Sequence, residues 1–378
     1  MRQGGSSLPE RAAATTPRAA RPLIVSQGNS PNRTPTLLLL RRVRRSPIRR
    51  CCVPCSRKGE SGSGSGRGCG PAETAVLARG TAVAATGLDV ERRQARLAGG
   101  ATIDFDGLII ATGVIPRRLP YGGLNGVHVL RTLNDALALR AALLTGPRVV
   151  VVGAGFLGTE VAATARTMGL EVTLVEPEHC GVPVRGLCEG GGRVTGAELA
   201  DGSGLPADVV VLALGYVPAT DWLTGSGLTL ANGVVRDALC RAAPGIYAAG
   251  DVASWRNPGF GTRMRLEHRM NATEQAMVAV GNLLGDAQPF APVPYFWTDQ
   301  YDTKIQAYGI FPPDAELRID GDPQDGHFAA AYGRHGAVVG VRGWNAPRQV
   351  RALRSLVAER ALWTTSTDTP AFLPVAVN

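Results

Sequence analysis

Long hydrophobic runs are the feature that this sequence most plainly lacks. The stretch 37–40 is only four leucines long, whereas a membrane-spanning helix needs roughly 20 consecutive apolar residues. This absence argues against a membrane-bound protein, and we expect a cytoplasmic protein with no membrane partner.

Cysteine is also scarce. The seven cysteines are odd in number and unevenly spread, which argues against a disulfide scaffold. A zinc site is an open alternative, but the spacing of the four N-terminal cysteines matches no paired C-x-x-C site, and no bound metal is expected. These four are Cys51, Cys52, Cys55 and Cys69.

Acidic residues are almost missing from the first seventy positions. Residues 1–70 contain fourteen Lys and Arg but only two acids, a net charge of +12. Since the whole chain carries +9, residues 71–378 carry −3. The basic character therefore belongs to one segment, and no nucleic-acid partner is expected.

This basic segment is rich in Arg, Ser, Gly and Pro and has no hydrophobic period. It buries too little apolar surface to offset the entropy of ordering, so residues 1–70 are predicted to form a disordered tail. Three alternatives stay open: contact of residues 41–50 with nucleic acid or anionic lipid, an organelle transit peptide, and the zinc site above. Residues 62–70 are typical of a linker.

Residues 148–176 contain the strongest motif. A β-branched apolar strand, 149–152, leads into a G-x-G-x-x-G turn, then a helix over 159–168, and then a strand, 171–175, that ends on an acid. These features in this order predict a dinucleotide-binding unit. The turn consists of Gly153, Ala154, Gly155, Phe156, Leu157 and Gly158.

Each glycine of the turn has its own role. Gly153 permits the tight turn, Gly155 lets the backbone approach a pyrophosphate, and Gly158 lets helix and strand pack closely. The helix N-terminus offers unpaired N–H groups and a positive dipole end to the phosphates. Glu176 can accept hydrogen bonds from a ribose 2′-hydroxyl and repels a 2′-phosphate, so NAD is favoured over NADP.

The remaining chain alternates short strands with helices. From residue 295 onward the pattern predicts a separate small α+β domain. The other predicted elements are a meander within 72–105, a buried strand at 105–113, a helix at 131–144, a strand pair at 193–199 and 205–207, a buried strand at 209–214 that Gly215 ends, a strand at 244–251 and a helix at 271–284.

On these residues the chain resembles the flavin-dependent ferredoxin reductases of bacterial oxygenase systems, the putidaredoxin and rubredoxin reductase type. The resemblance covers roughly residues 71–378. It is carried by the glycine turn and by the stretches FDGLIIATG, APGIYAAGDVA and YFWTDQYDTKIQAYG. The third stretch discriminates best, because it is similar to the C-terminal domain of this family.

The resemblance implies an α/β fold, namely a two-dinucleotide-binding-domain flavoprotein with a small α+β C-terminal domain. A Rossmann-like NAD domain is inserted in the FAD domain. The implied ranges are 71–145 for the first part of the FAD domain, 146–240 for the NAD domain, 241–290 for the second part of the FAD domain and 291–378 for the C-terminal domain.

The implied activity is hydride transfer from NADH to FAD, followed by single electrons to a small [2Fe–2S] ferredoxin. The cofactors are then FAD and NAD. The protein needs no acid, base or nucleophile of its own, because the flavin performs the redox steps. The lack of a paired-cysteine motif agrees, since relatives that use a dithiol need two closely spaced thiols.

The resemblance also implies roles for individual residues. Asp251, next to Gly250, matches an acid on the ribityl side of FAD, where a carboxylate suits hydroxyl donors. Thr112 and Gly113 match the turn that lets the backbone lie close to the cofactor. Arg131 matches an arginine that contacts FAD; a surface helix charge is the alternative reading.

Two residues are the implied catalytic pair. Glu160 matches an acid that faces the nicotinamide, and Trp297 matches an aromatic residue beside the flavin ring. Glu267 matches a further flavin-side position, whereas Arg269 stands where relatives carry an apolar or aromatic residue. Phe156, Leu157 and Gly215 complete the set of predicted cofactor-binding residues.

One element of the family is not found. Its N-terminal strand, second glycine turn, helix and terminal acid have no counterpart in residues 1–70, and only about fifteen residues (177–191) follow Glu176 where a helix and a strand are usual. The FAD domain is therefore predicted to be incomplete and the NAD domain shortened. Two alternatives stay open: a non-catalytic remnant with weak NAD binding and no stable FAD, and a wrongly started or out-of-phase segment 1–70.

Overall fold

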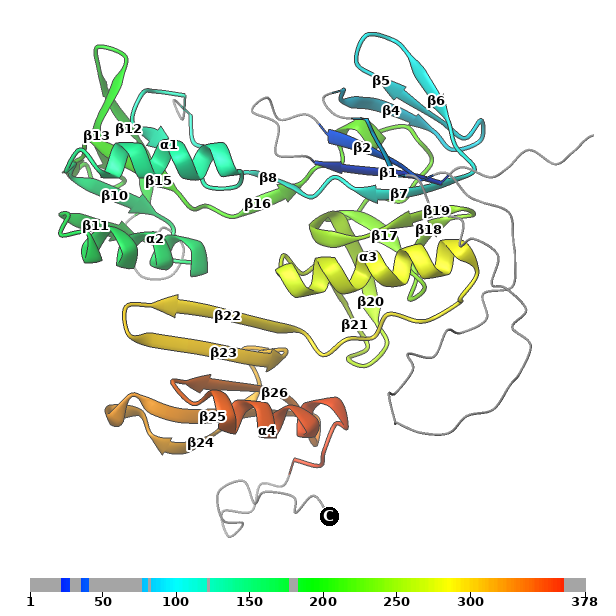
Figure 1. The fold of residues 1–378 in the computed structure, drawn as a ribbon. Coiled ribbons are helices and arrows are strands. Elements are labelled where there is room, and N and C mark those ends of the chain that lie inside the picture. The colour runs from blue at the N-terminus through cyan, green and yellow to red at the C-terminus, as the bar shows by residue number, and fades with distance from the viewer. Residues whose placement is uncertain are drawn as a thin grey trace, which may run out of the picture.

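The computed structural model describes residues 22–27, 35–40, 77–80, 83–120, 123–176 and 183–363, the first three ranges for their backbone alone. Figure 1 shows three bodies. We call them the host unit (the described residues of 22–116 and 216–290), the inserted unit (the described residues of 117–215) and the C-terminal domain (295–363). The first two are sheets flanked by helices, as expected of an α/β fold.

The host unit is built around β7 (Gly107–Ala111), in which Gly107 to Ile110 are buried. Successive strand side chains point to opposite faces, so Leu108 and Ile110 pack under an antiparallel meander while Ile109 packs against α3 (Arg269–Leu284). Burial on both faces explains why this strand is uniformly apolar. The other strands of the unit with described side chains are β4 (Ala85–Asp89), β5 (Gln94–Leu97) and β6 (Thr102–Asp104) of the meander, with β18 (Arg241–Ala243), β19 (Ile246–Ala248), β17 (Val234–Arg236), β20 (Ala253–Asn257) and β21 (Thr262–Met264).

The prediction of a disordered tail over residues 1–70 is wrong for two strands. β1 (Pro22–Gln27) pairs in parallel with β7, and β2 (Pro35–Leu40) pairs antiparallel with β1 and with β3 (Leu77–Gly80). The sheet order is β18-β19-β7-β1-β2-β3. A free edge of β7 would leave buried backbone groups unpaired, and pairing with β1 satisfies them. The cluster 41–50, the four N-terminal cysteines and the linker 62–70 lie outside the described residues.

The inserted unit has a parallel sheet of order β11-β10-β15-β9 with β10 (Val149–Val152) inside it. Val149 and Val151 pack toward α1 and α2, whereas Val150 and Val152 pack toward a second meander. The predicted strand that is buried on both faces is thus confirmed. The other elements are β9 (Val127–His128), α1 (Leu133–Leu143), α2 (Phe156–Thr167), β11 (Val172–Val175), β12 (Val184–Gly190), β13 (Arg193–Leu199), β14 (Gly204–Pro206) and β15 (Val209–Leu212).

The predicted boundaries of this unit, 146 and 240, are both wrong. Leu139 and Leu143 of α1 share a core with β10 and α2, so this helix belongs to the inserted unit and not to the preceding one. Leu223 and Val234 pack into the host core. The sequence misled because α1 precedes the glycine motif, and only packing shows which sheet it covers.

The segment after Glu176 is short, as predicted, but it holds a strand that the sequence analysis missed. β12 pairs antiparallel with β13 and extends the predicted strand pair to a meander of three strands. Within the described residues no helix lies between β11 and β12, and β11 forms an edge of its sheet. The uneven, glycine-rich pattern VRGLCEG hid the strand.

A two-stranded ribbon connects the two units. β8 (Val114–Pro116) leaves the host unit and β16 (Tyr216–Pro218) returns to it, and the two pair antiparallel. The chain therefore enters and leaves the inserted unit at one place (Figure 1).

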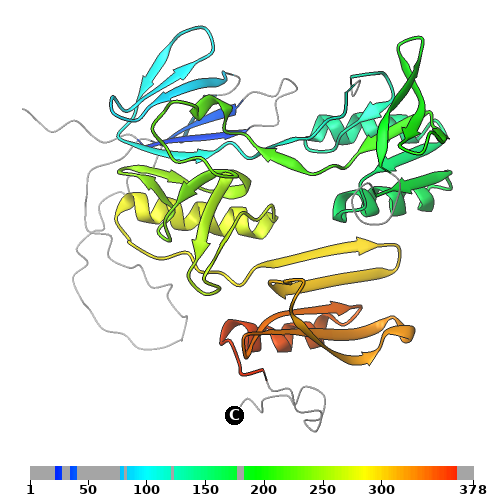
Figure 2. The same ribbon diagram turned by 180° about the vertical axis from the view of Figure 1, so that it is seen from behind.

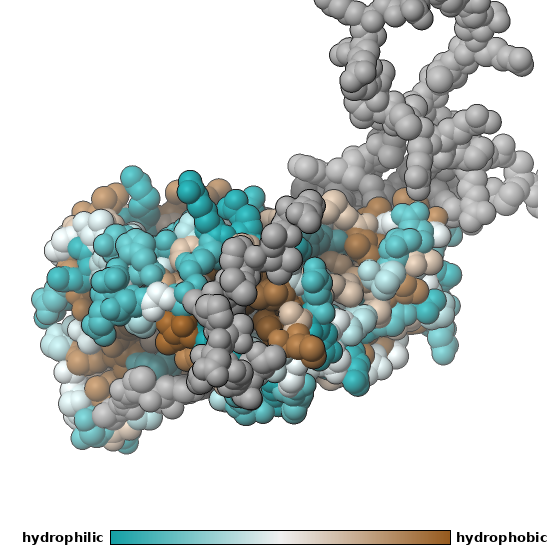
Figure 3. All heavy atoms as spheres, turned by 90° about the horizontal axis from the view of Figure 1, so that it is seen from below, coloured by the Kyte–Doolittle hydropathy of each residue, from teal (hydrophilic) through white to brown (hydrophobic). Residues whose placement is uncertain are grey.

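The C-terminal domain is a five-stranded antiparallel sheet, order β22-β23-β26-β25-β24, covered by α4 (Pro347–Ala358) through Val350, Leu353 and Val357. The predicted α+β domain is confirmed. Figure 2 shows the β22–β23 hairpin reaching beneath α2 of the inserted unit. Seen from below, the molecule is mostly hydrophilic with hydrophobic patches between (Figure 3). The strands are β22 (Tyr295–Gln300), β23 (Thr303–Gly309), β24 (Glu316–Asp322), β25 (His327–Arg334) and β26 (Ala337–Trp344).

Across the part of the chain that the structure describes, no helix combines the length and the apolar character needed to cross a membrane.

An ion pair at the start of the inserted sheet gives a pH-dependent prediction. Hydrogen bonds from the side chain and the backbone N–H of Arg148 lower the pKa of Asp208 from 3.8 to about 2. Because the folded-state pKa is depressed, the stabilisation is present above pH 3.8 and is lost as the pH falls toward 2. Both side chains are about half exposed, so Asp208→Asn should lower the free energy of unfolding at pH 7 by only about 0.2–1 kcal/mol.

Urea unfolding of both proteins across pH 3 to 7 measures this effect. The difference between wild type and Asp208→Asn should shrink toward the acid end. A difference that stays constant with pH would contradict the assignment.

Candidate active site

A cleft of about 590 Å³ lies where the three bodies meet. Its walls come from the first turns of α2, from the segment just before α1, from the turn η2 (Gly250–Val252) with the loop before α3, and from β22. Nine of the sequence-predicted residues, spread through the chain, are thus brought together. They are Arg131, Gly155, Phe156, Leu157, Glu160, Gly215, Asp251, Glu267 and Trp297.

The glycine turn has the geometry that its sequence predicts. Gly153 has φ +107°, and a Cβ there would strike the carbonyl oxygen of Ala213; a Cβ at Gly158 would strike that of Gly153. Only glycine fits these two positions. At Gly155 nothing lies within 4 Å of an added Cβ, so the space above this residue is open to a ligand.

The N-terminus of α2 is arranged to receive an anion. Gly155 is its N-cap and makes no side-chain cap, and the first turn carries no acidic residue. The orphan N–H groups of this turn therefore face the opening with a positive dipole end. These features fit a dinucleotide pyrophosphate.

Glu176 lies at the end of β11, beside the same turn. Its Oε2 accepts a hydrogen bond of 2.7 Å from the backbone N–H of Ala154. This contact fixes the carboxylate next to the glycine turn, where the sequence placed it. The preference for NAD over NADP stays a prediction.

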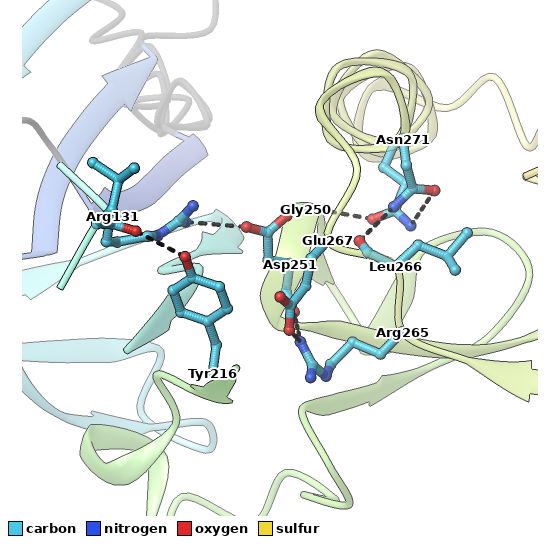
Figure 4. Close-up of polar contacts among 10 residues, drawn as sticks. Arg131, Tyr216, Gly250, Asp251, Arg265, Leu266, Glu267 and Asn271 are labelled. Atoms are coloured by element: carbon cyan, nitrogen blue, oxygen red, sulfur yellow. Dashed lines mark hydrogen bonds and ion pairs between the residues drawn. The ribbon is translucent and has the colours of Figure 1, made fainter. Parts of the chain in front are cut away.

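Two predicted flavin-side residues meet across the cleft. Arg131, just before α1, donates from Nη2 to Oδ2 of Asp251 at 3.0 Å, and its guanidinium lies over the Tyr216 ring (Figure 4). Burial raises the pKa of Asp251, and the charge of Arg131 opposes the shift. A desolvated carboxylate of this kind gains from further hydrogen-bond donors such as polyol hydroxyls.

A hydrogen-bond network behind Asp251 was missed by the sequence analysis. Gln275, fully buried in α3, accepts from the backbone N–H of Gly250 at 2.8 Å and donates to Asn271 at 3.3 Å. Arg265 donates to the carbonyl oxygen of Asp251 at 3.1 Å and to Glu267 at 2.6 Å. Asn271 and Gln275 are four residues apart and therefore share one helix face. This spacing of two amide side chains is the feature of the sequence from which the network could have been predicted.

Thr112 and Gly113 do not line the cleft. The Thr112 hydroxyl is buried and donates to the carbonyl oxygen of Ala219 at 2.9 Å, and the carbonyl oxygen of Gly113 accepts from the Ala219 N–H at 3.0 Å. Gly113 has φ +68°. Within the described residues they hold the returning chain near the ribbon, and their contact with the flavin stays a prediction.

The two predicted catalytic residues approach the cleft from different bodies. Glu160, in the second turn of α2, accepts from Thr298 of β22 at 2.6 Å. Trp297 is 38% exposed and stacks on Tyr295, with ring centroids 5.6 Å apart. Both side chains line the cleft, and β22 contacts both regions because it carries Trp297 and its Thr298 bonds Glu160.

The described residues fit part of an FAD molecule. Asp251 with Gly250, Arg131 and Trp297 suits the ribityl and ring portions. The pyrophosphate portion is different, because β1 and β2 run antiparallel and are joined by residues 28–34, whereas a strand–helix–strand crossover takes about a dozen residues or more. The described part of the host unit therefore contains no second helix N-terminus for this diphosphate after β1.

Two sheets with an anion-binding turn, a shared cleft and a third domain closing it define a two-dinucleotide-binding flavoprotein oxidoreductase. A family model described as pyridine nucleotide-disulphide oxidoreductase matches residues 4–180 and 179–276, and one described as reductase C-terminal matches 295–369. The chain belongs to the pyridine nucleotide-disulphide oxidoreductase family, whose cofactors are FAD and NAD(H). The match starts at residue 4, so most of the segment expected to be a tail aligns with the family.

Several relatives share most of this chain. The ferredoxin–NAD(+) reductase component of the anthranilate 1,2-dioxygenase system of Burkholderia cepacia is 35% identical over 326 residues, 77% of this chain and 79% of that protein. Putidaredoxin reductase of Pseudomonas putida is 30% identical over 324 residues, 76% of each protein.

Solved structures of ferredoxin reductases have a similar fold. The ferredoxin reductase for the CYP199A2 system of Rhodopseudomonas palustris has a TM-score of 0.68 at 34% identity, over 72% of this chain and 75% of that chain. The covalent putidaredoxin reductase–putidaredoxin complex gives 0.67 at 28% identity, over 74% and 75%.

Gly155→Ala tests the anion site. Gly155 has φ −65° and open space around it, so alanine should destabilise the fold by no more than about 1 kcal/mol, the cost of a poorer N-cap. The added methyl group keeps the pyrophosphate from the helix amides, and loss of one such charge-assisted bond should weaken NAD+ binding about tenfold or more.

Calorimetric titration with NAD+ measures the effect. Gly186→Ala, in an equally open position on β12, is the matched control and should bind NAD+ as the wild type does. Equal NAD+ affinities for the wild type and both variants would show that the glycine turn is not part of the NAD+ site.

Proposed function

We propose that this chain takes electrons from NADH through FAD and passes them to a small [2Fe–2S] ferredoxin. The observation that carries the proposal is the single cleft in which residues predicted for nicotinamide and flavin meet. The names of two relatives, a ferredoxin–NAD(+) reductase component and a ferredoxin–NAD(P)(+) reductase, support the choice of acceptor.

The roles of the residues follow from their positions. The free amides at the start of α2 bind the NADH diphosphate, and Glu160 orients the nicotinamide. Asp251, held by its buried network, accepts hydrogen bonds from the flavin ribityl chain. FAD, when bound, supplies the hydride acceptor and the one-electron donor. Phe156 and Phe296, with ring centroids 4.7 Å apart, exclude water from one end of the cleft.

Trp297 also suggests where the electrons leave. It borders a second hollow of about 590 Å³, which is also lined by Lys304 and Arg354. Tyr295 stacks between Trp297 and Tyr308, with ring centroids 5.6 and 4.5 Å away. The exposed face of α4 adds Arg348 and Arg351, and such a positive surface steers an acidic partner toward the hollow.

A non-catalytic remnant is the second candidate function. The antiparallel pairing of β1 with β2 favours it, because a dinucleotide-binding unit pairs its first strand with a parallel strand through a crossover helix. Such a protein would bind NAD weakly and retain no flavin.

One purification separates the two candidates. The enzyme should be isolated yellow, or turn yellow with added FAD, and should reduce a [2Fe–2S] ferredoxin with NADH. A colourless protein that binds NAD+ but neither takes up FAD nor oxidises NADH would establish the remnant.

Arg354→Glu tests the proposed acceptor surface. Reversing this charge should raise the KM for an acidic ferredoxin about tenfold, equivalent to roughly 1.4 kcal/mol, and should weaken the dependence of this KM on ionic strength. NADH oxidation with a small neutral acceptor should stay near the wild-type rate. Steady-state assays at two salt concentrations measure both. Arg318→Glu, on β24 and not among the residues that line the hollow, is the control. An equal rise of the KM in both variants would contradict the proposal that the ferredoxin binds at this surface.

A further inference from the structure

We propose that Thr298 of the C-terminal domain is a positioning residue for hydride transfer, which acts by holding the Glu160 carboxylate toward the nicotinamide. The inference rests on the proposed function, because it takes Glu160 to border the nicotinamide.

The contact between these residues is short and partly buried. Thr298 has no exposed surface, and its Oγ1 donates to Oε1 of Glu160 at 2.6 Å. This length is typical of a hydroxyl bound to an ionised carboxylate, which is about twice as strong as a neutral hydrogen bond. Glu160 is the only acid in α2, so no other carboxylate of this helix is available to accept from the Thr298 hydroxyl.

Neighbouring contacts show that the strand is built to meet this helix turn. Phe296, Thr298 and Gln300 alternate along β22 and therefore share one face. Phe296 packs on Phe156, and Gln300 Nε2 donates to the Thr159 hydroxyl at 2.9 Å. These three strand residues meet helix positions 156, 159 and 160, which are spaced i, i+3 and i+4 and also share a face.

The arrangement constrains a side chain that is otherwise free to rotate. A glutamate on a helix surface has several open rotamers, and only some of them point into the cleft. The hydrogen bond from the Thr298 hydroxyl restricts the Glu160 side chain to one of these rotamers. It does not involve the helix amides that hold the diphosphate. Through this bond the C-terminal domain contributes to the nicotinamide subsite.

Thr298→Val and Thr298→Ser separate the hydroxyl from the shape of the side chain. Valine keeps the volume and removes the donor, whereas serine keeps the donor. The first readout needs no flavin turnover: the affinity for NAD+ relative to ADP-ribose, which lacks the nicotinamide. Thr298→Val should lower this preference about tenfold, the equivalent of one lost charge-assisted hydrogen bond, with ADP-ribose affinity unchanged.

The second readout is the rate of flavin reduction by saturating NADH in stopped flow. Misplacing a group that orients the reacting atoms should slow this step about 10- to 100-fold in Thr298→Val. Thr298→Ser should stay close to the wild type in both assays. Thr303→Val, on the same hairpin but with a hydroxyl that donates to Asp302 and not to Glu160, is the control and should change neither.

The outcomes distinguish the inference from the proposed function. A wild type with no preference for NAD+ over ADP-ribose would contradict the nicotinamide role of Glu160 and with it the proposed site. A wild-type preference that Thr298→Val retains would overturn the inference alone. Equal weakening of both ligands, or failure of serine to restore the preference, would show a merely structural role and also overturn it.

Discussion

The close approach of the first turn of α2 to the ends of β10 and β15 is the constraint on which the rest of the structure depends. It requires bare backbone at Gly153 and Gly158, where any Cβ would strike a carbonyl oxygen. Because the helix starts so near the sheet, its unpaired amides open directly into the cleft. β22 then lies against this same turn, so one local contact brings together the diphosphate site, Glu160 and the C-terminal domain.

The two α/β units solve the same packing problem in the same way. In each, a central strand is covered on one face by helix, α3 in the host unit and α1 with α2 in the inserted unit, and on the other face by an antiparallel meander. Alternate side chains of β7 and β10 serve the two faces, which leaves polar groups only at the strand ends. The cleft forms at those ends, and the buried amides Asn271 and Gln275 fix the turn that carries Asp251 there.

The sequence predicted the local elements better than their assembly. The glycine turn, α1, α3 and the C-terminal domain could be read from residue patterns because their causes lie within a few residues of chain. The placement of α1 could not be predicted, because only tertiary packing shows that its Leu139 and Leu143 pack against the sheet of the inserted unit. β1 was not predicted because its pairing with β7 is a long-range interaction, which the local hydrophobic pattern does not reveal. Among the site residues, Arg131 and Asp251 were predicted separately, but their pairing was not.

The ribbon of β8 and β16 carries a consequence for engineering and for evolution. The entry and exit of the inserted unit lie side by side, with Val114 opposite Pro218 and Pro116 opposite Tyr216. A unit whose two ends are adjacent can be removed or replaced without stretching the domain that hosts it. Changes of length inside residues 117–215 are thus absorbed locally, and dinucleotide-binding modules from other proteins are candidates for grafting at this junction.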